Sequence, residues 1–143
     1  MFRPAPVRRS FCPFAAGLVL LALIVPAMPV PAVAGSEFPF GQELLLDVKP
    51  MRGSKRVPNL EIAANGATAI DLWCNRVQGQ IVVVENTISI LRGPITVRQC
   101  TPERVRGDEE LLAALLQAAR WKRQGDIVIL EGAKRMRFRI STN

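Results

Sequence analysis

From residue 44 onward, the chain consists mainly of short apolar runs separated by turn-forming residues, and this pattern limits the fold more than any other feature. Residues 60–64 and 67–73 flank Asn65-Gly66, which is the strongest two-residue hairpin signal in the sequence. Runs of this length are typical of strands. The sequence therefore predicts that antiparallel β-hairpins dominate the fold.

Two further hairpins are predicted, one with the turn Glu85-Asn86 and one with a Gly-containing turn. Their expected strands are residues 80–84 and 87–91, then 127–130 and 135–140. Together with a compact apolar run at residues 44–48, six or seven short strands are expected in roughly a hundred residues. The predicted fold class is α+β, mostly β, as a curled antiparallel sheet or a partly open small β-barrel.

One amphipathic helix, at about residues 108–122, is expected to pack on this sheet. Asp108 is the predicted N-cap, and Glu109 and Glu110 suit the positive first turn. The apolar stripe at helical spacing is Leu111, Leu112, Leu115, Leu116 and Ala119. Lys122 and Arg123 suit the end of the helix, and Gly125 can adopt the left-handed conformation that stops it.

The N-terminal segment has the three successive parts of an export signal. Three arginines precede an apolar stretch at residues 14–25, and Ala32-Val33-Ala34 gives a small-residue cleavage pattern. The sequence predicts a signal peptide at residues 1–34, a single domain at residues 35–143, and a periplasmic or secreted location. No membrane span is expected after cleavage. Cleavage would also remove Cys12, which lies within the signal peptide.

Removing the three signal arginines leaves sixteen basic residues against twelve acidic ones, so the net charge falls from +7 to +4. This moderate charge favours attraction to an anionic envelope component or an acidic protein, and nucleic acid is not an expected partner of an exported chain. The remaining cysteines, Cys74 and Cys100, predict one structural disulfide, because no close-spaced redox pair is present. The chain is expected to be monomeric.

Several kinds of catalytic chemistry have no support in this sequence. The chain contains no histidine, which excludes a Ser-His-Asp triad and His-containing zinc sites, and its glycines lack dinucleotide and P-loop spacing. No catalytic residue, cofactor or metal is therefore predicted. Two carboxylate sites are the alternatives: Asp71 with a second acid in the same cleft, or Asp108, Glu109 and Glu110 as paired acids or a hard-cation site, for which helix capping is favoured. A solvent-facing role for Asp71 is favoured.

Arg135, Arg137 and Arg139 alternate with apolar residues, so a strand would place all three guanidinium groups on one face. This arginine stripe is the best candidate anion-binding surface, against the simpler interpretation of a solvated outer face. A second basic cluster consists of Lys49, Arg52, Lys55 and Arg56, and it is expected in a solvated loop. Trp73 and Trp121 are either an aromatic ligand floor or, as favoured, packing residues.

The residues around the two cysteines resemble a known family. The matching positions are Cys74-Asn75, Gly79, Thr96, Cys100, Glu109 or Glu110, Leu112, Leu115, Trp121 and Gly125-Asp126. In this order and spacing they resemble the META-domain family, which includes the HslJ-like heat-shock proteins, with the clear part at about residues 71–140. The chain departs from the family pattern at Trp73, at Gln80 and at residues 97–99, which indicates a divergent member.

The resemblance implies a small, largely β domain of exported or envelope-associated bacterial proteins linked to stress tolerance, with no catalytic residue to transfer. Asn75, Gly79 and Thr96 are its motif positions in this chain. The predicted function is a non-enzymatic binding or stress-tolerance module of the cell envelope or periplasm. The alternative is a small exported β-barrel that inhibits a protease or another hydrolase, which would use a protruding loop or terminus.

Overall fold

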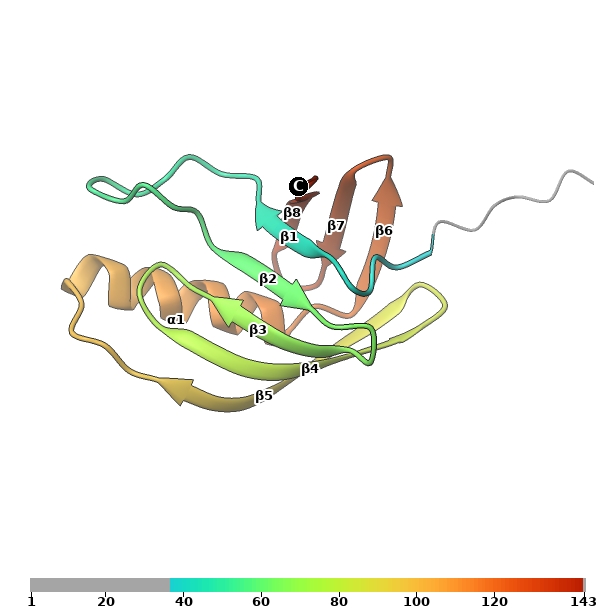
Figure 1. The fold of residues 1–143 in the computed structure, drawn as a ribbon, viewed down its shortest axis with the longest axis horizontal. Helices are drawn as coiled ribbons and strands as arrows, with labels where there is room; N and C mark the ends of the chain where they lie inside the picture. Colours follow the sequence, from blue (N-terminus) through green and yellow to red (C-terminus); the bar gives the residue numbers. More distant parts are fainter. Residues whose placement is uncertain (1–36, 143) are drawn as a thin grey trace, which may run out of the picture. The chain divides into compact units, whose positions relative to one another are not determined.

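The computed structural model describes residues 37–142, and these form an antiparallel barrel of eight strands with one helix (Figure 1). The strands are β1 Glu43–Leu46, β2 Asn59–Ile62, β3 Ala67–Asp71, β4 Arg76–Val84, β5 Thr87–Thr96, β6 Arg120–Gln124, β7 Ile127–Glu131 and β8 Arg135–Ile140, and the helix is α1 Pro102–Leu116. Each strand pairs with the next in the chain, and β1 pairs with β8. The predicted α+β, mostly β fold is confirmed.

All three predicted hairpins are present. The hairpin between β2 and β3 closes at Ala63 and Ala67, because the Ala63 N–H donates to the Ala67 carbonyl. The loop inside this pair is therefore residues 64–66, three residues rather than two, and the Gly66 N–H donates to the Ala63 carbonyl. Gly66 has a positive φ of 82°, as the third residue of such a loop requires. The Glu85-Asn86 turn joins β4 and β5 as predicted.

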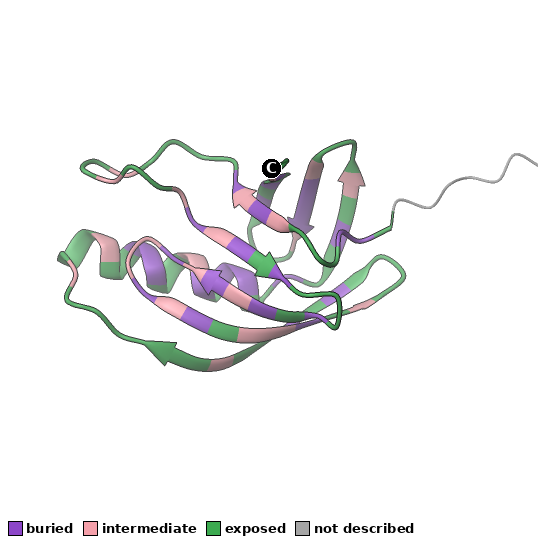
Figure 2. Cartoon of the chain, in the orientation of Figure 1, coloured by how far each residue is buried: buried purple, intermediate pink, exposed green. Residues whose placement is uncertain are grey.

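The core lies inside the barrel, and buried residues alternate with more exposed ones along several strands (Figure 2), as expected for strands with one face toward the core. In β8, Met136, Phe138 and Ile140 are buried and the intervening arginines are exposed, as the alternation predicts. The most buried apolar side chains of this core are Leu44, Leu60, Ile70, Val77, Ile88, Leu115, Val128, Leu130 and Phe138. Helix α1 adds Leu112, Ala114 and Leu115 to the same core.

The ring of strands is weakest between β5 and β6. Only Thr87 of β5 pairs with β6, at Arg120, although β5 is ten residues long. Within the described chain, the rest of β5 pairs with β4 alone, and much of it is exposed (Figure 2). Helix α1 connects the end of β5 to β6 and contacts β5. The helix thus lies where the sheet is incomplete. Among residues 37–142, no helix is long and apolar enough to span a membrane.

The helix was predicted at 108–122, and both of these bounds are wrong. It begins at Pro102 with Thr101 in the N-cap position, and it ends at Leu116. Residues 120–124 form β6 instead, because they pair with β7 at five successive positions. Gly125, predicted to end the helix, has a positive φ of 59° in the turn between β6 and β7.

Trp121 explains why this segment prefers a strand. Its ring is buried and packs edge-on against Phe38, with the ring centroids 5.0 Å apart. Its indole N–H donates to the Glu85 carbonyl at 2.8 Å. A helix continuing through residue 122 would lose these contacts and the ladder to β7. The packing interpretation of Trp121 agrees with this geometry.

Candidate functional site

A buried polar cluster joins the turn after β3 to the helix. Asp108 is 3% exposed and lies in the second turn of α1, so its predicted role as N-cap is wrong. One carboxylate oxygen accepts from the Asn75 N–H and the Asn75 side-chain amide, both at 2.9 Å, and the other accepts from the Cys74 N–H at 3.1 Å. Three donors thus compensate this buried carboxylate.

The oxygen of the Asn75 side-chain amide extends this cluster to a third segment. It accepts from the Arg98 N–H at 2.8 Å, and a disulfide joins Cys74 to Cys100 with their Cα atoms 6.2 Å apart. The predicted cysteine pairing is therefore the one in the structure. The disulfide and Asn75 together fix the segment between β5 and α1 against the turn after β3.

The remaining motif residues also occupy structural positions. A Cβ at Gly79 would lie 2.7 Å from the Leu91 carbonyl, so the close approach of β4 and β5 requires glycine there. Thr96 ends β5 and pairs with Arg76. Asn75 and Thr96 lie at the end of the barrel where β4 begins, and Gly79 lies farther along β4 opposite Thr68. The three residues do not line a common pocket among the described residues.

An apolar groove of about 360 Å³ lies beside this cluster, between the β1–β2 loop, α1 and β8. Its apolar lining consists of Leu46, Val48, Met51, Trp73, Leu111, Ala114 and Met136. Gly107 forms part of the lining, and a Cβ there would meet the end of Met51 and the Trp73 ring, the latter at 2.8 Å. The volume is within the ~300–1,000 Å³ typical of small-molecule sites.

Charged side chains surround the apolar groove. Lys134, Arg135 and Arg137 line it together with Asp47 and Glu110, which leaves one net positive charge at the rim. The structure thus brings Trp73 together with two residues of the arginine stripe. Sequence reasoning did not place Met51, Leu111 and Met136 in one site, because the three lie on elements that only the closed barrel brings together.

Each arginine of the stripe already has an acidic partner. Asp47 pairs with Arg139 at 2.8 Å and with Arg137 at 3.6 Å, and Glu131 lies 3.8 Å from Arg135. All three arginines remain more than half exposed. The predicted anion-binding role of Arg135, Arg137 and Arg139 stays a prediction, and these two carboxylates would compete with an incoming anion.

A second hollow, of about 320 Å³, lies next to Trp73 on the side of the disulfide. Four basic residues line it, and we call it the basic hollow: Lys55, Arg56, Arg98 and Arg104. Lys55 and Arg56 belong to the second basic cluster seen in the sequence. Arg98 and Arg104 come from the segment before α1 and from its first turn, and no sequence pattern linked them to this loop.

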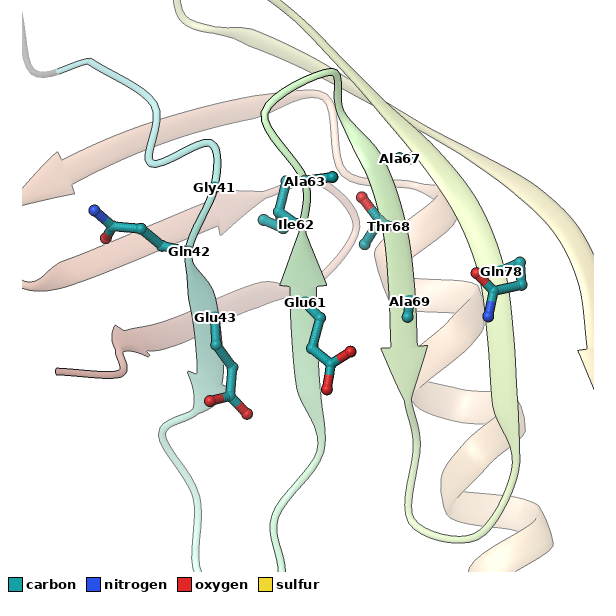
Figure 3. Close-up of a pocket in the computed structure, with 10 residues that line it drawn as sticks. All are labelled: Gly41, Gln42, Glu43, Glu61, Ile62, Ala63, Ala67, Thr68, Ala69 and Gln78. Carbon is teal, nitrogen blue, oxygen red and sulfur yellow. The ribbon is translucent and has the colours of Figure 1, made fainter. Parts of the chain in front are cut away.

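A third, shallow hollow lies over the outer face of β1 to β4, where Glu43 and Glu61 stand side by side on neighbouring strands (Figure 3). Arg76 bonds the Glu61 carboxylate at 2.8 Å and the Asp71 carboxylate at 2.7 Å. The hydrogen bond to Glu61, together with the charges of Asp71 and Glu61, raises the pKa of Arg76 in spite of desolvation. Asp71 is therefore part of a surface ion-pair network, and pairs of this kind contribute only ~0–1 kcal/mol.

Comparisons with known proteins agree with this architecture. The family model of the META domain matches residues 42–143. A solved NMR structure of a protein from Burkholderia xenovorans superimposes with a TM-score of 0.59 at 19% identity, covering 83% of this chain and all of that one. Another NMR structure gives a TM-score of 0.56 at 15% identity, covering 70% of this chain and 89% of that one. At these identities, the likeness to the two structures supports a shared fold and nothing further. The search of curated proteins found no match to the chain.

Proposed function

Because this chain belongs to the META domain family, we propose that it is an exported, non-enzymatic module of the cell envelope that binds a small amphipathic ligand in the apolar groove. The family suggests an envelope-associated module, and the META domain is not a known enzyme family. The export signal predicted at residues 1–34 supports the location, although it lies outside the described residues. The ion pairs of Asp71 support a structural rather than a catalytic role for that acid.

The observation that carries the ligand proposal is the apolar lining of the groove. Leu111 is only half buried on α1, and Met51 and Trp73 are likewise half buried beside it. Apolar surface left in a concave site with a charged rim is typical of ligand binding. The net positive rim favours a ligand with an apolar body and an anionic end.

The test is displacement of the fluorescent probe N-phenyl-1-naphthylamine by dodecanoate from the full chain. Leu111→Gln should weaken dodecanoate binding about tenfold, because a buried leucine contributes roughly 1.5 kcal/mol or more and 1.4 kcal/mol is tenfold in affinity. The matched control is Leu116→Gln, the same change on the same helix at a residue that is 38% exposed and outside the groove lining. Absence of probe binding, or equal weakening by both variants, would refute the proposal.

The alternative of a hydrolase inhibitor needs a segment that can enter a target cleft. The β1–β2 loop extends past the ends of its strands (Figure 1), but Arg104 of α1 donates to the Gly53 carbonyl at 2.9 Å and ties the loop to the helix. The inhibitor hypothesis stays a prediction. Co-purification of the mature chain with an exported protease or lysozyme would support it.

A further inference from the structure

The basic hollow concentrates positive charge that has no acidic partner in the part of the chain that the structure describes. Among residues 37–142, the ion pairs of the structure do not include Lys55, Arg56, Arg98 or Arg104. The one carboxylate in the lining belongs to Asp71, which Arg76 bonds at 2.7 Å. The arginine stripe, by contrast, carries an acidic partner at every arginine. The basic hollow is therefore the less neutralised of the two surfaces.

Hydrogen bonds and the disulfide hold the backbone around these cations. Arg104 fixes the β1–β2 loop through its 2.9 Å bond to Gly53, and Ser54 closes the next turn by donating to the Arg56 carbonyl at 2.9 Å. The backbone of Arg98 is held in place because its N–H donates to the Asn75 side-chain oxygen and because the disulfide joins nearby Cys100 to Cys74. Cations held by three separate elements repel one another, and a multiply charged anion between them would relieve that repulsion.

We propose that the basic hollow is a second ligand site, specific for phosphate-class anions such as a phosphomonoester or pyrophosphate group. A guanidinium fork matches two oxygens of a phosphate, and Arg56 and Arg98 supply two such forks beside the ammonium group of Lys55. Three free cations suit a group with more than one negative charge better than a single carboxylate. This site does not depend on the apolar groove, although Trp73 lines both.

The test is calorimetric titration of the full chain with inorganic pyrophosphate at low and at physiological salt. The double variant Arg56→Gln and Arg98→Gln should bind about a hundredfold more weakly, at roughly tenfold for each charge-assisted contact. Only backbone atoms of these two residues take part in the hydrogen bonds of the structure, so the variant should keep its fold. The matched control is Arg92→Gln and Arg120→Gln, two exposed arginines outside the apolar groove and the basic hollow, which removes the same charge elsewhere and should leave pyrophosphate affinity within about twofold.

The proposal is overturned if the wild-type chain does not bind pyrophosphate, or if both double variants lose the same affinity. A second arm identifies the source of the phosphate, using vesicles of phosphatidylcholine with and without phosphatidate. Sedimentation with phosphatidate vesicles that requires Arg56 and Arg98 assigns a lipid headgroup. Pyrophosphate binding without such sedimentation assigns a soluble phosphate compound.

Discussion

Asp108 shows at the scale of one residue how a common pattern can conceal a different role. An acid that precedes two glutamates and a leucine run is typical of a helix N-terminus, yet here it lies inside the helix and accepts three hydrogen bonds from Cys74 and Asn75. The signal that could have located the true start is Thr101-Pro102, a capping residue followed by a proline in the first turn. With the start placed there, Asp108 becomes an acid on the buried face.

Replacing Asp108 with alanine should lower the free energy of unfolding by about 3 kcal/mol, because three buried donors would lose their acceptor. Urea unfolding followed by circular dichroism measures this change. Glu109→Ala, an exposed neighbour on the same helix, should change stability by less than about 0.5 kcal/mol. Similar losses in the two variants would show that the cluster does not stabilise the fold.

At the scale of elements, the strands were more predictable than the helix. The alternation in β8 and the turns at Asn65-Gly66 and Glu85-Asn86 are local signals, and the structure has each of them. The predicted apolar stripe continued past Leu116 to Ala119, but the ladder between β6 and β7 and the packing of Trp121 on Phe38 outweigh it. Contacts between distant segments decide such a boundary, and a local pattern does not contain them.

Strands β6, β7 and β8 are linked on their outer face by Glu131, which gives a pH dependence. The hydrogen bond from Lys122, at 2.7 Å, lowers the pKa of Glu131, and the charges of Lys122 and Arg135 add to this against the effect of desolvation. A carboxyl whose pKa is lower in the folded state stabilises the protein above its unfolded value near 4.5. That stabilisation is lost as the pH falls through the folded value.

Glu131→Gln should therefore be less stable than the wild type at neutral pH, and the difference should shrink as the pH falls below about 4. Urea midpoints measured across this pH range test the expectation. Glu109→Gln, on the exposed face of α1, is the control and should follow the wild-type curve. A constant difference between Glu131→Gln and the wild type would show that the ion pair is not the cause.

For the whole molecule, composition and turn spacing predicted a mostly β domain, but not that the ring closes. Closure depends on the pairing of β1 with β8, whose residues are more than ninety positions apart in the chain, as in Leu44 with Ile140. The apolar groove depends on that closure, because β8 supplies part of its lining beside the β1–β2 loop and α1. The basic hollow depends instead on the contact of the β1–β2 loop with α1 and with the segment before it, which are distant in the sequence. Trp73 and the arginine stripe could be named as candidates in advance, but not their proximity.

The full chain, expressed in a bacterium with an outer membrane, should be recovered from the periplasm or medium and begin at Gly35. Intact mass measured without reductant should be lower by two hydrogens than after reduction, because Cys74 and Cys100 are joined. Ala34→Asp, which places a charge at the cleavage site, should block processing. Recovery of the uncleaved wild-type chain from the cytoplasm would contradict export.

The pairing between β5 and β6 is the place where the barrel can open most readily. A ring in which one joint has a single paired position can open there and remain a continuous eight-strand sheet, with every other ladder intact. A local opening of this kind needs less free energy than global unfolding. Helix α1 connects the two sides of that joint and carries Leu111 and Ala114 of the groove, so the same opening would widen the groove. Under the function proposed above, the longest acyl chain that binds is expected to depend on the strength of the pairing between β5 and β6 as much as on the resting volume of the groove.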